Sequence, residues 1–177
     1  MDLTETHIST DPAASGFPWY ALYVSPNRER VVSQLLRDRG YEVFMPTYRR
    51  LRQWSDRRVE LDWPLFPGYT FGRFDLERSF PVLKMPGVVR FVGFGNRPVA
   101  LPDSEIDAVR RMAAEGSQMW PHRFLRSGRR IRVQQGPLAG VEGMLVRVKS
   151  GHRLVISIDI LQRSVAAEVD IAHVRPD

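Results

Sequence analysis

The chain has 177 residues, of which 43% are hydrophobic and 26% are charged, proportions that exclude a disordered chain and predict a packed core. Its net charge of +6 favours polyanionic partners, because lysine and arginine displace counterions from phosphates. Almost all of the basic residues are arginine, which suits phosphate and carboxylate recognition, but a GC-rich genome would give the same bias. The absence of cysteine excludes disulfides, thiolate metal sites and cysteine nucleophiles.

The first segment, 1–16, is polar and weakly acidic, and it lacks the basic and then apolar layout of a secretion signal. We therefore expect it to form a disordered tail. No stretch of the sequence approaches the roughly 18 consecutive apolar residues of a membrane span. These features indicate a cytoplasmic protein without a membrane partner.

The next part of the chain mixes strand and helix patterns. An aromatic and β-branched run at 19–24 predicts a strand. Ser25 and Pro26 are typical of an N-cap and a first helical residue, and they predict a helix that ends at Gly40. The later runs predict two strands, at 41–46 and 61–66, on either side of an arginine-rich hairpin segment at 48–60. They then predict an alternating strand at 68–74, a short helix at 76–85, a strand at 88–94 and a helix at 102–116. This order predicts an α+β domain over 17–112, with an N-terminal antiparallel sheet flanked by helices.

The character of the sequence changes after this domain. Segment 113–126 lacks a sustained period and contains Gly116 and Pro121, so we interpret it as a linker. Short runs rich in valine and isoleucine follow, without helical periodicity: 129–133, 143–149, 153–161, 164–170 and 171–174. Closely spaced strands over 127–177 predict a small all-β barrel, because closing a sheet removes its exposed edges.

Several motifs together resemble one protein family. Trp19-Tyr20 ahead of a helix, Leu65-Phe66-Pro67-Gly68-Tyr69 and Pro86-Gly87-Val88-Val89-Arg90-Phe91-Val92-Gly93 resemble the N-terminal (NGN) domain of NusG-type transcription factors. The string Gly136-Pro137-Leu138-Ala139-Gly140-Val141-Glu142-Gly143 is similar to the KOW motif of their second domain. The resemblance spans nearly all of 17–174 and implies an NGN-like domain followed by an SH3-like KOW barrel. Independently of any partner, the three glycines of this string suit the backbone angles of a tight barrel corner.

The bend at Phe66-Pro67-Gly68-Tyr69 places two large aromatic residues beside a Pro-Gly pair. The resemblance implies that Phe66, Pro67, Tyr69 and Phe71 help form an apolar surface that binds the clamp helices of the largest RNA polymerase subunit. Aromatic anchors are typical of such an interface. The alternative is a core turn that buries the rings. We expect Phe66 and Tyr69 to face outward, and Phe71 stays open between contact and core.

The segment 48–58 holds five arginines around two aromatic residues, a pattern that favours contact with phosphates and stacking on bases. A solvated hairpin tip is the alternative interpretation. The resemblance implies a position beside the upstream fork of the transcription bubble, near the non-template or upstream DNA. The residues predicted to contact nucleic acid are Arg28, Arg49, Arg50, Arg52, Trp54, Arg57 and Arg58.

The resemblance implies a monomeric elongation or antitermination factor that acts by binding. Its first domain would bridge the polymerase cleft and modulate pausing, and its KOW domain would recruit Rho or a small-subunit ribosomal protein. We expect no enzyme activity, cofactor or metal, since the sequence has no Walker loop, no dinucleotide fingerprint and no histidines at metal-ligand spacing.

Two questions stay open at this point. The form of 64–69 is similar to the specialised RfaH-like branch of the family, so the protein serves either all genes or selected operons. The alternative function is a ribosome-associated KOW-type RNA-binding protein, although that hypothesis leaves 17–92 unexplained.

Overall fold

The structure, a computed structural model, describes residues 16–53, 58–114, 119–125, 128–136, 138–148 and 151–176. The expected tail, apart from Gly16, lies outside these ranges, as do Trp54, Arg57 and Pro137. Arg52 and Arg58 are described by their strand positions only.

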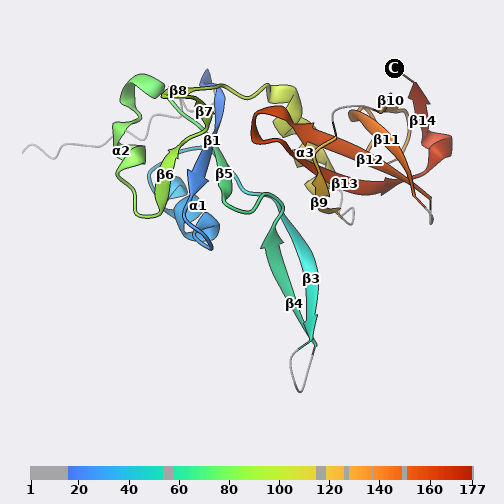
Figure 1. The fold of residues 1–177 in the computed structure, drawn as a ribbon, viewed down its shortest axis with the longest axis horizontal. Helices are drawn as coiled ribbons and strands as arrows, with labels where there is room; N and C mark the ends of the chain where they lie inside the picture. Colours follow the sequence, from blue (N-terminus) through green and yellow to red (C-terminus); the bar gives the residue numbers. More distant parts are fainter. Residues whose placement is uncertain are drawn as a thin grey trace, which may run out of the picture.

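A four-stranded antiparallel sheet forms the body of the N-terminal half (Figure 1). Its strand order is β2-β5-β1-β6. The central strands are β1 (Trp19–Val24) and β5 (Tyr69–Arg73), and the edge strands are β2 (Val43–Phe44) and β6 (Val88–Phe91). The strand predicted at 41–46 is thus shorter than expected, and it ends before Pro46, which has no N–H to donate to a ladder.

One face of this sheet is covered by α1 (Glu29–Arg37) and the short α2 (Phe80–Leu83), which follows the 3₁₀ turn η2 (Leu76–Arg78). Because successive strand side chains point to opposite faces, every second residue of β1 faces these helices. The buried cluster on this face consists of Tyr20, Leu22, Val24, Val32, Leu36, Phe74, Val82, Met85 and Phe91.

Helix α1 begins three residues later than the sequence predicts, at Glu29 instead of Pro26. Ser25 and Pro26 form a turn that is closed by a hydrogen bond of 3.1 Å from the Arg28 N–H to the Ser25 carbonyl. Asn27 in this turn has a φ of +60°. A residue in the left-handed region cannot continue a right-handed helix, so the helix starts only after it. The prediction that Ser25 caps the helix is therefore wrong.

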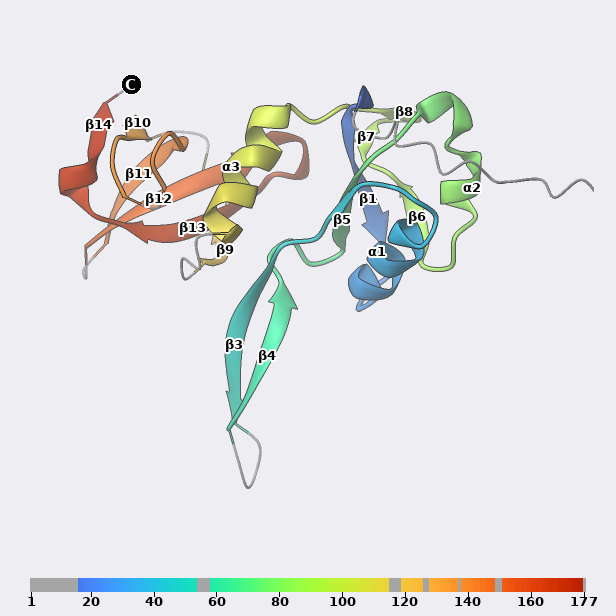
Figure 2. The same ribbon diagram turned by 180° about the vertical axis from the view of Figure 1, so that it is seen from behind.

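Strands β3 (Thr47–Gln53) and β4 (Arg58–Pro64) pair in a long antiparallel hairpin. The sequence analysis expected a hairpin here, but with strands at 41–46 and 61–66 on either side of the arginine-rich segment. The structure instead places most of that segment within the two paired strands. Figures 1 and 2 show this hairpin extending away from the N-terminal sheet and from the C-terminal strands. A second, small hairpin of β7 (Gly93–Phe94) and β8 (Arg97–Pro98) follows β6.

Helix α3 (Asp103–Ala114) lies between the N-terminal sheet and the C-terminal strands in both views (Figures 1 and 2). Its buried apolar side chains are Ile106, Val109 and Met112. They belong to one continuous apolar cluster that includes Phe71 of the N-terminal sheet and Ile156 of the C-terminal half. The two halves of the chain therefore share a core across α3.

The C-terminal half is a six-stranded antiparallel sheet with the order β14-β10-β11-β12-β13-β9. Its strands are β9 (Met119–Arg123), β10 (Arg129–Val133), β11 (Glu142–Val148), β12 (Gly151–Ile158), β13 (Arg163–Val169) and β14 (Val174–Pro176), with 3₁₀ turns η3 (Asp159–Leu161) and η4 (Ile171–His173). The prediction of an α+β half followed by an all-β half is thus confirmed. Pairing between β9 and β14 is absent within the described ranges, so closure into a barrel stays a prediction.

Two local predictions for this half are wrong. Met119–Arg123, inside the segment interpreted as a linker, forms strand β9 and pairs with β13. Pro121 is tolerated there because β9 is an edge strand. Residues 171–173 form η4 instead of a strand, since the Asp170 carboxylate caps the turn by accepting a hydrogen bond of 2.9 Å from the Ala172 N–H. The domain bounds themselves stay a prediction.

Candidate functional site

The bend at 66–69 is a tight turn fixed to two other elements. The Tyr69 N–H donates to the Phe66 carbonyl at 3.0 Å, and Gly68 has a φ of +84°, which is the signature of a type II turn with proline in second position. The Gly68 carbonyl accepts from the Val24 N–H at 2.9 Å. The Gly68 N–H donates to the Glu29 carboxylate at 2.7 Å. The turn is therefore held by both β1 and α1.

The ring of Phe66 lies in the core, which corrects the expectation that it faces outward. Its side chain is 2% exposed, and that of Phe71 is fully buried. The two rings meet edge to face with centroids 5.2 Å apart, a favourable aromatic geometry. Both belong to the cluster that continues through α3 into the C-terminal sheet. Burial of Phe66 depends on this long-range packing, which no local pattern reports.

A row of three side chains crosses the sheet at the surface next to this turn. Tyr23 stands opposite Tyr69 in β5 and opposite Arg90 in β6. The two tyrosine rings are 5.5 Å apart, and the Arg90 guanidinium lies 5.6 Å from the Tyr23 ring centroid. Both tyrosines are partly exposed, while Arg90 and Pro67 are exposed. We call Tyr23, Pro67, Tyr69 and Arg90 the tyrosine surface.

The sequence analysis found only part of the tyrosine surface. It named Pro67 and Tyr69 but missed Tyr23 and Arg90. The alternation of β1 places Tyr23 on the face of the sheet opposite to that of Leu22, and this was a usable signal. The register that brings Tyr23 beside Tyr69 comes from pairing of strands far apart in the chain.

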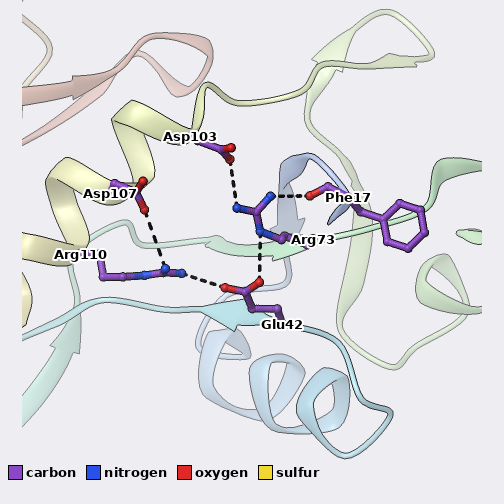
Figure 3. A network of polar contacts seen from close by, with 6 residues as sticks. All are labelled: Phe17, Glu42, Arg73, Asp103, Asp107 and Arg110. Carbon is purple, nitrogen blue, oxygen red and sulfur yellow. Dashed lines mark hydrogen bonds and ion pairs between the residues drawn. The ribbon is translucent and has the colours of Figure 1, made fainter. Parts of the chain in front are cut away.

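Helix α3 is joined to the N-terminal sheet by a network of ion pairs and hydrogen bonds (Figure 3). The Glu42 carboxylate binds Arg73 Nε at 3.1 Å and Arg110 Nη2 at 3.2 Å. The two guanidinium groups lie 4.9 Å and 5.2 Å from the Trp19 ring centroid. Arg73 also pairs with Asp103 at 3.2 Å, and it donates to the Phe17 carbonyl at 2.6 Å. The interface between α3 and this sheet thus combines ion pairs with aromatic contacts.

The other side of α3 borders a cavity of about 550 Å³ that it shares with the C-terminal sheet. Glu105 on α3 and Asp159 in η3 both line it. Burial and, to a smaller extent, the Asp159 carboxylate raise the pKa of Glu105 to about 7, although a hydrogen bond from the Asp159 backbone opposes both effects. This contact between α3 and the C-terminal sheet is therefore sensitive to protonation near neutral pH.

The hairpin brings together two of the arginines predicted to contact nucleic acid, Arg49 and Arg50. Both are exposed. Arg49 pairs with Glu60 at 3.8 Å, whereas the Arg50 guanidinium lies 5.8 Å from the ring centroid of Trp63. Trp63 was not among the predicted residues.

Arg28 is not part of this hairpin. It lies at the N-terminus of α1, beside the segment that leads into β6, where a Cβ on Gly87 would come within 3.2 Å of it. The structure instead brings Arg30 to the hairpin, since its Nη2 donates to the Asp62 carbonyl at 3.4 Å. The predicted set of nucleic-acid residues is therefore divided between two places.

The glycines of the KOW-like string have the backbone roles expected of them at two positions. Gly136 and Gly140 have φ of +82° and +81°, in the turn between β10 and β11. Gly143 has a different role, because a Cβ there would lie 2.7 Å from the Val155 carbonyl oxygen. It allows β11 to pass close to β12.

Within the described parts of the chain, no three histidine or acidic side chains are grouped as a metal site would require. No helix in those parts has the length and apolar composition needed to cross a membrane.

Comparison with known proteins gives consistent matches. A family model described as "Transcription termination factor nusG" matches residues 17–110. The transcription termination/antitermination protein NusG of Escherichia coli K12 is 28% identical over 152 residues, covering 83% of this chain and 84% of that protein. The protein of the same description from Buchnera aphidicola is 25% identical over 171 residues, covering 89% and 94%.

A solved structure also resembles this chain over both halves. It is described as "Domain interaction in Thermotoga maritima NusG", and it matches with a TM-score of 0.55 and 19% identity. The match covers 92% of this chain and 98% of that one. At this level of identity the comparison supports the fold.

Proposed function

Since the chain belongs to the NusG family of transcription termination/antitermination factors, a family of transcription factors and not of enzymes, we propose that it binds RNA polymerase through its N-terminal sheet. The proposed target is the pair of clamp helices of the largest subunit. From there, as a monomer, it bridges the cleft and modulates pausing. It does so by binding one state of the transcribing enzyme more tightly than another, which shifts the population between them.

The tyrosine surface is the observation that carries this proposal. Tyr23 and Tyr69 present partly exposed rings in a row that Arg90 extends, and the exposed Pro67 adjoins it. Such side chains combine a large apolar area with a polar tip, which suits the docking of a helix. Phe66 and Phe71 lie beneath this surface, so in our proposal they support Tyr69 and Pro67 instead of touching the polymerase themselves.

We propose that the C-terminal half acts as an SH3-like KOW module that recruits Rho or a small-subunit ribosomal protein. The glycine turn of Gly136 and Gly140 and the six antiparallel strands support this assignment. In this scheme 17–112 is the polymerase-binding domain and 127–177 is the recruiting domain. The family match to 17–110 favours this function over that of a ribosomal RNA-binding protein, for which the N-terminal half has no role.

The hairpin and Arg28 are proposed to contact the non-template or upstream DNA. The hairpin extends away from the rest of the protein and presents Arg49 and Arg50 in solvent, which supports this role. Arg28 is exposed on α1, so its contact with DNA would be a separate one.

A binding experiment with core RNA polymerase tests the main proposal. Tyr69→Ser and Tyr23→Ser are expected to weaken binding by about tenfold or more each, because central aromatic residues dominate such interfaces. The matched control is Phe94→Ser, which removes a ring that is 75% exposed on the small β7–β8 hairpin. Thermal unfolding of each variant checks that the fold is retained.

Equal affinity of the wild type and both tyrosine variants would contradict this assignment. Tight binding to ribosomal RNA without any binding to polymerase would favour the ribosomal alternative. If binding is confirmed, a pause assay on several templates at matched salt shows whether the factor suppresses or stimulates pausing. The same assay shows whether the factor acts on every template, as a general factor would, or on selected ones, as an RfaH-like factor would.

A further inference from the structure

We propose that the β3–β4 hairpin is a one-sided site for single-stranded nucleic acid, in which Arg50 and Trp63 stack with an unpaired base and contact its phosphate. This inference rests on the proposed function, which places the hairpin near nucleic acid. It goes further because it selects one face of the hairpin and one form of the ligand.

The register divides the hairpin into two unlike faces. Tyr48 stands opposite Trp63, and Arg50 stands opposite Leu61. Because side chains alternate along each strand, these four lie on one face, which we call the aromatic face. On the other face, Arg49 stands opposite Asp62, and Glu60, two residues before Asp62 in β4, lies on the same face. We call that second group the acidic face.

The charges of the two faces differ in the same way. Arg49 pairs with Glu60 at 3.8 Å, and Asp62 stands opposite Arg49 in the register, so the described charged groups of the acidic face are two carboxylates and one guanidinium. On the aromatic face, no described carboxylate pairs with Arg50, whose guanidinium lies over the Trp63 ring. A phosphate group is therefore attracted to Arg50 and repelled by the carboxylates behind it.

The contact between Arg50 and Trp63 also prepares a stacking surface. The guanidinium lies 5.8 Å from the indole centroid, within the range of a cation–π contact. Trp63 is partly exposed, but its Nε1 is buried and makes no hydrogen bond with any described residue. Its accessible part is therefore ring carbon, which suits stacking and not hydrogen bonding. Bases stack well on arginine planes and on aromatic rings of this kind.

These features favour a single strand over a duplex. Bases in a duplex are already stacked on each other, so their faces are not available to Arg50 and Trp63. A single strand can instead splay its unpaired bases out towards these two side chains.

Binding of fluorescent oligonucleotides to the full-length protein tests the proposal. The probes are a single-stranded DNA and a single-stranded RNA of the same sequence, each about 15 nucleotides long, and the duplex of the DNA. Arg50→Ser is expected to weaken single-strand binding by about tenfold. Arg50→Lys keeps the charge but not the planar group, so it should recover only part of that loss.

The neighbouring residue offers a matched control. Arg49→Ser removes the same charge from an exposed position on the acidic face, where Glu60 already pairs with the guanidinium, so it is expected to weaken binding much less than Arg50→Ser does, by less than about threefold. Equal loss in the two serine variants would overturn the one-sided site. Binding of the duplex as tight as that of the single strand would overturn the choice of ligand. The difference between the DNA and RNA probes identifies which strand the site takes.

The same variants separate this inference from the proposed function. Arg50→Ser is expected to bind core polymerase normally in the absence of nucleic acid, and Tyr69→Ser is expected to bind the oligonucleotides normally. If neither tyrosine variant loses polymerase binding while the oligonucleotide results are as expected, only the proposed docking surface is rejected. If Arg50→Ser binds the oligonucleotides as tightly as the wild type does, only the hairpin site is rejected.

Discussion

The carboxylate of Glu29, in the first turn of α1, accepts a hydrogen bond of 2.7 Å from the backbone N–H of Gly68, which lies 39 residues later in the chain. Glu29 is only 6% exposed, although it carries a charge. Its position near the positive end of the helix dipole also favours the carboxylate. This contact connects the first helix to the turn that precedes the tyrosine surface.

Replacing Glu29 is expected to destabilise the fold. Glu29→Ala leaves the Gly68 N–H without its acceptor, and a buried hydrogen bond to a charged group contributes about 1.5–3 kcal/mol to the free energy of unfolding. Glu29→Gln keeps an acceptor oxygen, so a smaller loss is expected. Urea unfolding measures the change, with the exposed Glu77→Ala as the control. A Glu29→Ala protein as stable as the control would show that the contact is unimportant.

Gly68 and Gly40 form a natural pair for testing the turn itself. Their φ angles are nearly equal, +84° and +82°. A Cβ on Gly68 would touch the Tyr23 ring at 3.4 Å, whereas a Cβ on Gly40 would meet no atom within 4 Å. Both alanine variants are expected to lose about 1 kcal/mol of unfolding free energy from backbone strain. Gly68→Ala should also weaken polymerase binding, because backbone strain in this turn shifts Pro67 and Tyr69 of the tyrosine surface, and an effect of Gly40→Ala of the same size would argue against that cause.

Arg73 is expected to be the most important member of the network over Trp19. Its side chain is 16% exposed, and it binds Glu42, Asp103 and the Phe17 carbonyl (Figure 3). Arg73→Ala should lower the free energy of unfolding by about 2 kcal/mol, because the largely buried Arg73 is a charged donor to three acceptors, which all lose it. The control is Arg78→Ala, whose side chain is 89% exposed and 3.9 Å from Asp75, with an expected change below about 0.5 kcal/mol. Stability is measured by thermal unfolding. Equal losses of stability in Arg73→Ala and Arg78→Ala would contradict this ranking.

The raised pKa of the Glu105 carboxyl determines how we expect the stability of the protein to vary with pH. Its pKa rises from an ordinary value of 4.5 to about 7 because of burial and then because of the Asp159 carboxylate. The folded form therefore holds a proton that the unfolded form has already released between these two pH values. The stabilising contribution is complete below pH 4.5, and it is lost as pH rises through 7.

The variant that tests this dependence is Glu105→Gln, which cannot ionise. Its Tm should exceed that of the wild type at pH 8, and the difference should shrink towards pH 5. Asp159→Asn removes the second cause, so it should reduce the pH dependence without abolishing it. A difference between Glu105→Gln and the wild type that stays constant from pH 5 to pH 8 would show that Glu105 does not titrate in this range.

Local patterns predicted the elements that local forces determine. The run at 19–24 coincides with β1, and the run at 129–133 coincides with β10. The helix that begins at Asp103 was also predicted, because helical spacing and capping residues act over a few neighbours. The local prediction was wrong where one dihedral decided the outcome, since Asn27 in the left-handed region delays α1.

Pairing with distant strands accounts for the elements that the sequence analysis missed. Met119–Arg123 has weak strand character and contains Pro121, yet it is a strand because β13 supplies its hydrogen-bond partners. The tyrosine surface has the same origin. Tyr23, Tyr69 and Arg90 are far apart in sequence, and only the order β5-β1-β6 brings them into one row.

By itself the sequence determined the family, the order of an α+β half and an all-β half, and the turn at 66–69, because each of these follows from short-range patterns or from motifs in series. The tertiary structure alone decided which aromatic rings reach the surface. Phe66 and Tyr69 are three residues apart in one turn, yet Phe66 is buried in a cluster that continues into α3 and the C-terminal sheet, while Tyr69 stays partly exposed beside Tyr23. Burial is a property of everything that packs around a side chain, and the cluster that contains Phe66 includes residues from distant parts of the chain.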